Sequence, residues 1–237
     1  IKTHHNRVPI IEEMMAQGRV IEPLADLYKV EVRALGRKLG IPDHALDRHP
    51  FPGPGLGVRL LCSTGDGQQP DVAEHLNSYT AKAGLSSLAL PIKSVGVKAD
   101  LRCYEHPFLL TGEASFDTLL EVSRQILAEV PDVNRALWNL DTKAPTSARV
   151  LPATMTKERL DLLREADHLV MEGLRRHGLY DEIWQCPTAM APLELDGRGR
   201  ELVIIRPVHS TRAMTASPVQ LPATLIAELR ESILALD

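Results

Sequence analysis

The stretch LSSLALPIKSVGVKADLRCYEHPFLLTG (residues 85–112) contains two apolar runs of strand character, near 87–97 and 101–111. Short apolar runs rich in valine, leucine and isoleucine, and separated by polar residues, are typical of strands. The next residues, 115–130, have a helical pattern, and a short strand is expected over 134–141. The stretch therefore predicts a small sheet with a helix packed against it.

The same order of elements is expected a second time in the last third of the chain. Two strand-like runs, near 184–195 and 201–210, are joined by the glycine-bearing turn DGRGRE, and a helix is expected over 222–236. This second copy stops at Asp237, where a last strand would begin. The helices that open the two copies are expected over 71–83 and 156–178.

The repeated order predicts an α+β fold made of two layered sheet-plus-helix units. The helix over 156–178 has Thr156 as its N-cap and ends at Gly178. Helices are also expected over 9–16 and 22–42 and a strand over 58–62. We predict the domain boundaries 1–49, 50–150 and 151–237.

The segment RHPFPGPGLGVR (48–59) joins the N-terminal helices to the first repeat. Proline fixes φ and removes an N–H group, and glycine leaves the backbone bare. Their alternation predicts a rigid loop that serves as a linker, a turn or a wall against which a flat ligand lies.

Composition excludes several classes of protein. A net charge of −4 argues against nucleic-acid binding, and no apolar run reaches the length of about 18 residues that a membrane span needs. Three cysteines without C-x-x-C spacing exclude a disulfide framework and predict a reducing, cytoplasmic location. The chain begins IKTHHN without an initiator methionine, so we expect it to be cut from a longer protein.

Common nucleotide and hydrolase motifs are absent from the sequence. It has no G-x-x-x-x-G-K-[ST] loop, no G-x-G-x-x-G that opens a helix and no G-x-S-x-G. The adjacent His4 and His5 lack metal-ligand spacing, and no metal site is expected.

Several polar residues interrupt otherwise apolar runs and leave two interpretations open. Asp100 and Arg102 either form a solvated hairpin or bind a ligand, with Arg102 as a planar donor fork and Asp100 as an acceptor of N–H groups. Gln185 needs partners for its amide, either a ligand edge or the backbone. Lys143 is either a surface lysine or a phosphate contact.

Four stretches, taken in order, closely resemble the C-terminal part of the GMP synthases, the glutamine-hydrolysing amidotransferases. They are IKTHHN (1–6), EPLADLYKVEVRALGRKLGIP (22–42), RHPFPGPGLGVR (48–59) and PIKSVGVKADLRCY (91–104). A later run, IIRPVHSTRAMTASP (204–218), resembles the family more weakly. The repeated sheet unit resembles the longer form of the family, in which the dimerisation region is duplicated.

The resemblance implies a ligase that converts XMP to GMP. In the family, a glutaminase domain releases ammonia, and an ATP-pyrophosphatase domain uses ATP and Mg²⁺ to form adenylyl-XMP. Residues 1–49 would be the end of that second domain with its lid loop, and the rest would form the XMP-binding and dimerisation region of a homodimer. Neither ATP nor Mg²⁺ is expected to bind to this chain alone.

The resemblance also implies roles for individual residues. Lys2, in the lid, would act in catalysis near the phosphates of ATP or of the intermediate. The residues that would contact XMP are Pro54, Gly55, Asp100, Arg102 and Gln185.

Three parts of the family pattern are missing: the glutaminase cysteine, the S-G-G-V-D-S loop and the tail K-P-P-x-T-I-E-W-E. The chain alone is therefore expected to be inactive. Two alternatives stay open: a catalytically inert binding or assembly module, and another ATP-pyrophosphatase ligase, NAD synthetase-like or tRNA-thiolating.

Overall fold

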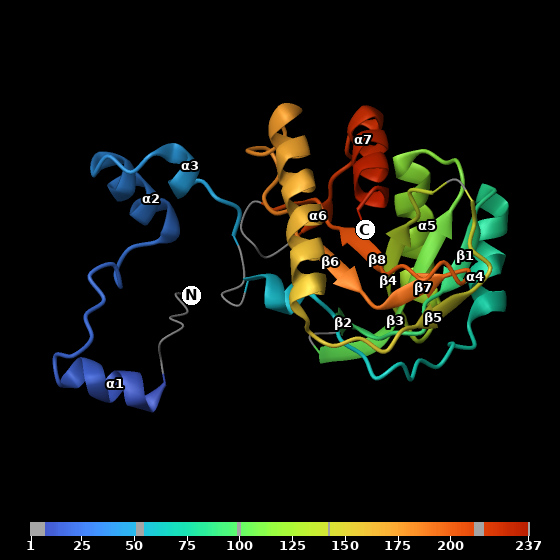
Figure 1. The fold of residues 1–237 in the computed structure, drawn as a ribbon, viewed down its shortest axis with the longest axis horizontal. Helices are drawn as coiled ribbons and strands as arrows, with labels where there is room; N and C mark the ends of the chain where they lie inside the picture. Colours follow the sequence, from blue (N-terminus) through green and yellow to red (C-terminus); the bar gives the residue numbers. More distant parts are fainter. Residues whose placement is uncertain (1–7, 51–54, 99–100, 142, 211–215, 237) are drawn as a thin grey trace. The chain divides into compact units, whose positions relative to one another are not determined.

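The fold is a mixed α+β arrangement, as predicted, of helices and several small sheets (Figure 1). The computed structural model describes residues 8–50, 55–98, 101–141, 143–210 and 216–236. It divides into an N-terminal unit, Ile1–His49, and a main unit, Pro50–Asp237, which are described separately.

The helices agree with the predicted ones in most places. The α-helices are α1 (Pro9–Ala16), α2 (Lys29–Lys38), α3 (Asp43–Leu46), α4 (Ala73–Thr80), α5 (Phe116–Glu129), α6 (Lys157–Arg176) and α7 (Ala223–Leu234). Two 3₁₀ turns are η1 (Gly55–Arg59) and η2 (Ala81–Ala83). The strands are β1 (Ser86–Ala89), β2 (Ser94–Lys98), β3 (Leu101–Thr111), β4 (Val133–Trp138), β5 (Ala148–Val150), β6 (Thr188–Ala191), β7 (Leu193–Leu195), β8 (Leu202–Ile205), β9 (Val208–His209) and β10 (Ser217–Pro218).

The first repeat, α4 to β4, is built on the long strand β3. Strands β1 and β2 both pair with it antiparallel, with Ala89 opposite Phe108 and Val97 opposite Arg102, and β4 pairs with it parallel. The predicted strand over 87–97 is therefore two strands rather than one. Pro91 lies between them, and it has no N–H group with which to continue a ladder of hydrogen bonds.

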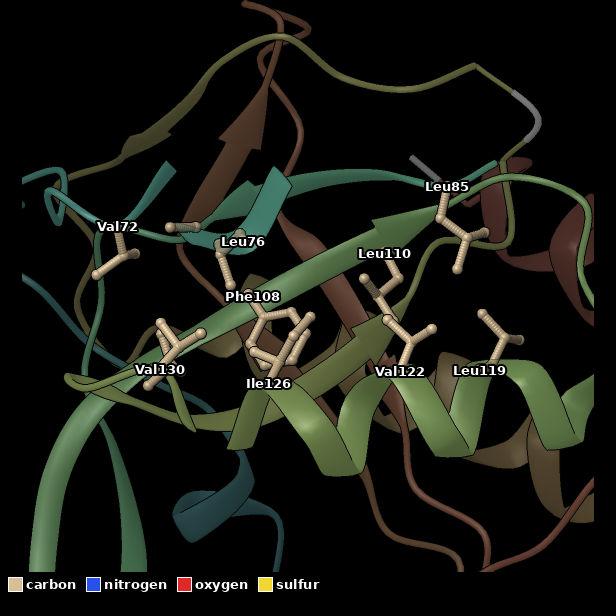
Figure 2. Close-up of a cluster of buried hydrophobic side chains, with 11 residues drawn as sticks. Val72, Leu76, Leu85, Phe108, Leu110, Leu119, Val122, Ile126 and Val130 are labelled. Atoms are coloured by element: carbon tan, nitrogen blue, oxygen red, sulfur yellow. The ribbon is translucent and has the colours of Figure 1, made fainter. Parts of the chain in front are cut away.

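A buried apolar cluster joins β3 to the helices of the first repeat (Figure 2). Phe108 and Leu110 lie on β3, and Val122 and Ile126 project toward them from α5. The apolar residues of α5 recur at helical spacing and so form one continuous face. Ser115 begins the helix, because its Oγ accepts a hydrogen bond from the Thr118 N–H at 3.1 Å.

The second repeat, α6 to α7, packs on the other face of β3. Leu109 points away from Phe108 and is buried in a second cluster with Val150 and Leu193 of the strands β5 and β7. In the second repeat itself, β6 pairs antiparallel with β8, and α6 and α7 lie side by side (Figure 1). The two repeats thus share this second apolar cluster.

Two predicted elements nearer the N-terminus were also wrong in extent or type. The helix predicted over 22–42 begins only at Lys29, where the Glu31 carboxylate accepts a hydrogen bond from the Tyr28 N–H at 2.6 Å and so caps the helix. The strand predicted over 58–62 is largely the turn η1, followed by a single bridge between Leu60 and Met190.

The N-terminal unit has almost no interior. Among its described residues only Gly36 is buried, whereas Ile21, Val30 and Leu39 are each more than 70% exposed. Apolar side chains gain stability only when they leave water, so α1 to α3 do not form a core of their own. In the described part of the chain, no helix is both long and apolar enough to cross a membrane.

Three carboxylates hold the strands and turns where the two repeats meet. Asp196 accepts hydrogen bonds from the Thr146 and Ser147 N–H groups at 2.9 and 3.1 Å, which lowers the pKa of its carboxyl group. Glu194 has a lowered pKa because it binds Arg149, and Asp141 has one because it binds Arg198 and Arg230.

We expect the free energy of unfolding to fall on acidification. A carboxyl group whose folded pKa is lowered contributes stability above its unfolded pKa, about 4, and loses it as the pH falls through the folded value. Urea unfolding at pH 7 and at pH 3.5 measures the difference. In Asp196→Asn that difference should be smaller than in the wild type, and in Asp181→Asn, an exposed aspartate elsewhere, it should be unchanged. An equal acid loss in Asp196→Asn and the wild type would contradict this.

Candidate functional site

The candidate site begins where the proline–glycine segment enters the main unit. Gly55 has a φ of +63°, and nothing lies within 4 Å of the place where a Cβ would be. Glycine adopts this conformation more readily than any other residue, and here it leaves open backbone. Of the other residues predicted to form the site, Lys2, Pro54 and Asp100 lie outside the described residues.

Gln185 ties this segment to the second repeat. Its Nε2 donates a hydrogen bond to the Pro50 carbonyl at 2.7 Å, across 135 residues of sequence. Its backbone pairs with Val208 through hydrogen bonds of 3.3 and 2.8 Å. The backbone is therefore the partner of one end of the Gln185 amide, which was one of the two alternatives left open by the sequence.

Arg102 lies in a different place, on the part of β3 that pairs with β2. Its side chain is exposed, and its Cα partner is Val97. The structure thus brings Gln185 to the start of the proline–glycine segment and leaves Arg102 exposed on the hairpin of the first repeat.

Two arginines that the sequence analysis did not single out add positive charge. Arg135 on β4 donates hydrogen bonds to the Val95 carbonyl at 3.0 Å and to Ser94 Oγ at 3.4 Å. Desolvation lowers the pKa of Arg135 and of Arg206, and the charge of Arg135 lowers that of Arg206 further. Each is an arginine within an apolar strand-like run, which was a signal available in the sequence.

The end of η1 is fixed by an ion pair. Arg59 is 7% exposed, and its Nη1 and Nη2 lie 2.6 and 3.2 Å from the two carboxylate oxygens of Asp167 on α6. Arg59 Nη1 also donates to the Thr188 carbonyl at 3.0 Å. The turn that starts at Gly55 is therefore attached to both α6 and β6.

The buried Cys186 does not offer a nucleophile here. Burial raises the pKa of the Cys186 thiol to about 12, and the nearby Asp167 carboxylate adds to the effect. Cys62 is exposed, although it was expected in an apolar strand. Over the described ranges, no group of three or more histidine, cysteine or acidic residues is arranged to hold a metal ion. The described residues therefore do not fit a Mg²⁺ site.

Comparison with known proteins gives one consistent result. The chain is 39% identical over 238 residues to a probable glutamine-hydrolysing GMP synthase of Leptospira interrogans, an alignment that covers 99% of the chain. The chain is homologous to GMP synthase. A probable GMP synthase of Caenorhabditis elegans is 27% identical over 98% of the chain, and the GMP synthase of Fusobacterium nucleatum is 35% identical over 62% of it. No family model matches.

The homology confirms the predicted relationship to GMP synthase. The chain spans only 39% of the length of the Leptospira protein and 41% of the Caenorhabditis protein. The activity, substrates and partners of the whole GMP synthases are therefore proposals for this chain.

Proposed function

We propose that this chain is the XMP-binding part of a GMP synthase, which converts XMP to GMP through an adenylyl-XMP intermediate. The observation that carries the proposal is the homology over 99% of the chain. The hydrogen bond between Gln185 and Pro50 supports it, because it joins two stretches that the family resemblance assigns separately to XMP.

Each contact residue has a chemical role in this proposal. Gly55, with Pro54 before it, gives the purine a wall of backbone without bulk. Arg102 donates its planar fork to oxygen atoms of XMP, and Asp100 accepts from N–H groups. The side-chain carbonyl of Gln185 accepts a hydrogen bond from the nucleotide, since its Nε2 is held by Pro50.

The arginines Arg135 and Arg206 support an anionic ligand. The charge of Arg135 lowers the pKa of Arg206, and two neighbouring guanidinium groups are less costly to hold together when an anion lies between or beside them. The phosphate of a nucleotide is such an anion, and bidentate contact with arginine suits its geometry.

The remaining parts of the enzyme are assigned to other segments of the same protein. The exposed apolar residues of the N-terminal unit support its packing on an ATP-pyrophosphatase domain, which would bind ATP and Mg²⁺. Lys2 would meet phosphate oxygens there as a point charge. A glutaminase domain would supply ammonia, and two copies would form a homodimer through the main unit.

Calorimetric titration of the purified chain tests the proposal. XMP should bind and AMP at the same concentrations should not, because the carbonyl oxygens of xanthine and the amino group of adenine present different hydrogen-bonding groups. The chain alone, with ATP, Mg²⁺, XMP and ammonium salt, should make no GMP. A folded chain that binds neither nucleotide would refute the proposed site, and sustained GMP formation would show that a complete site lies within these residues.

A further inference from the structure

We propose that Arg59 and Asp167 are positioning residues: their ion pair, in which Arg59 is buried and Asp167 half-buried, fixes η1, and with it Gly55, on the second repeat. This rests on the proposed function only in that Gly55 is taken as part of the nucleotide site. Neither residue needs to touch the nucleotide, since Arg59 is four positions further along η1 and Asp167 lies on α6.

The geometry of the pair defines an orientation as well as a contact. Both nitrogen atoms at the end of Arg59 face Asp167, at 2.6 and 3.2 Å, and the Thr188 carbonyl accepts a third hydrogen bond. A planar fork that meets a carboxylate in this way fixes the rotation of the arginine as well as its distance. Thr188 is itself fully buried on β6, so the turn is tied to two rigid elements.

The residues that follow η1 are held by the same helix. Arg159 of α6 donates from Nη2 to the Leu61 carbonyl at 2.7 Å, and the Leu61 N–H donates to Met190 at 2.9 Å. Arg159 and Asp167 are eight residues apart, which is about 12 Å along a helix. The helix α6 therefore holds the segment at two separated points, and η1 lies beside it (Figure 1).

The chemistry of the pair argues for a role in positioning. Taking the Arg59 guanidinium, and most of the Asp167 side chain, out of water costs free energy, so such an ion pair often contributes no more stability than well-packed apolar residues of the same volume. Two apolar side chains at these positions would pack together without fixing the orientation of the η1 backbone. The pair is thus suited to holding the backbone at Gly55 in one orientation.

Asp167→Asn tests the proposal in the purified chain. The amide retains the shape but loses the charge and one acceptor, so hydrogen exchange at the backbone N–H groups of residues 55–62 should become faster. Affinity for XMP, measured well below the melting temperature, should fall about tenfold. Leu174→Ala is the control. Leu174 lies in the buried apolar cluster between α6 and α7, so its replacement destabilises the main unit without touching the ion pair. It should lower the melting temperature without changing either readout.

A second variant covers the case in which Asp167→Asn does not fold. Arg59→Lys keeps the charge beside Asp167 but loses the fork, and it should give the same local exchange and loss of affinity. Unchanged exchange over 55–62 in a folded variant would overturn the proposal, as would equal changes in Leu174→Ala. If the wild type does not bind XMP, the proposed function fails, and the exchange measurement still decides whether the ion pair holds η1.

Discussion

Replacing Phe108 by alanine is expected to lower the free energy of unfolding by about 3–5 kcal/mol. Phe108 is fully buried in the cluster between β3 and α5, and its ring contacts apolar residues from both (Figure 2). The loss combines the transfer of apolar surface with an unfilled cavity, because close-packed neighbours relax only in part. Urea unfolding followed by circular dichroism measures it.

The matched control for Phe108→Ala is Val95→Ala. Val95 lies on β2 of the same repeat but is 47% exposed. Its replacement should change the free energy of unfolding by no more than about 0.5 kcal/mol. A cost below about 1 kcal/mol for Phe108→Ala would mean that β3 and α5 do not form the described core.

Replacing Arg102 by alanine is expected to weaken XMP binding by about thirty- to several-hundred-fold. The reason is the loss of a charged hydrogen bond that becomes buried when the ligand binds, which costs on the order of 2–4 kcal/mol. Because Arg102 is exposed in the described structure, its removal should leave the melting temperature nearly unchanged. Calorimetric titration with XMP measures the affinity.

The control for Arg102→Ala is Arg124→Ala. Arg124 is an exposed arginine on α5 that pairs with Glu121, so its removal changes the net charge equally but not the site. Its variant should bind XMP like the wild type. If Arg102→Ala also binds like the wild type, then Arg102 belongs to a solvated hairpin, the other interpretation of its sequence context.

The long helices were predictable from sequence because local signals define both their faces and their ends. Thr156 begins α6 as predicted, and its Oγ1 accepts a hydrogen bond from the Arg159 N–H. The segment over 58–62 was not predictable, since its apolar residues suit a strand and only tertiary contacts make η1. The helix α2 begins late because the Glu31 carboxylate caps the Tyr28 N–H group. Apolar spacing alone does not indicate this capping contact.

The candidate site was predictable in part. Gln185 was identified as an unusual polar residue, but its partner Pro50 is far away in sequence and no local pattern indicates it. The pairing of Arg59 with Asp167 could not be predicted for the same reason, since the two residues are 108 positions apart. The sequence pattern singled out Arg102, and family resemblance added Gly55 and the expected contact of both residues with XMP; these roles stay predictions.

The core that Leu109 shares with Val150 and Leu193 has a consequence for how the main unit melts. Neither repeat can open without exposing apolar surface of the other, so the two should unfold in a single cooperative transition. A nucleotide that binds only the folded state would then stabilise both repeats by mass action, including residues it never touches. If either repeat were expressed alone, the apolar face of this shared cluster would be exposed to water. Exposed apolar surface of this kind promotes aggregation before folding is complete.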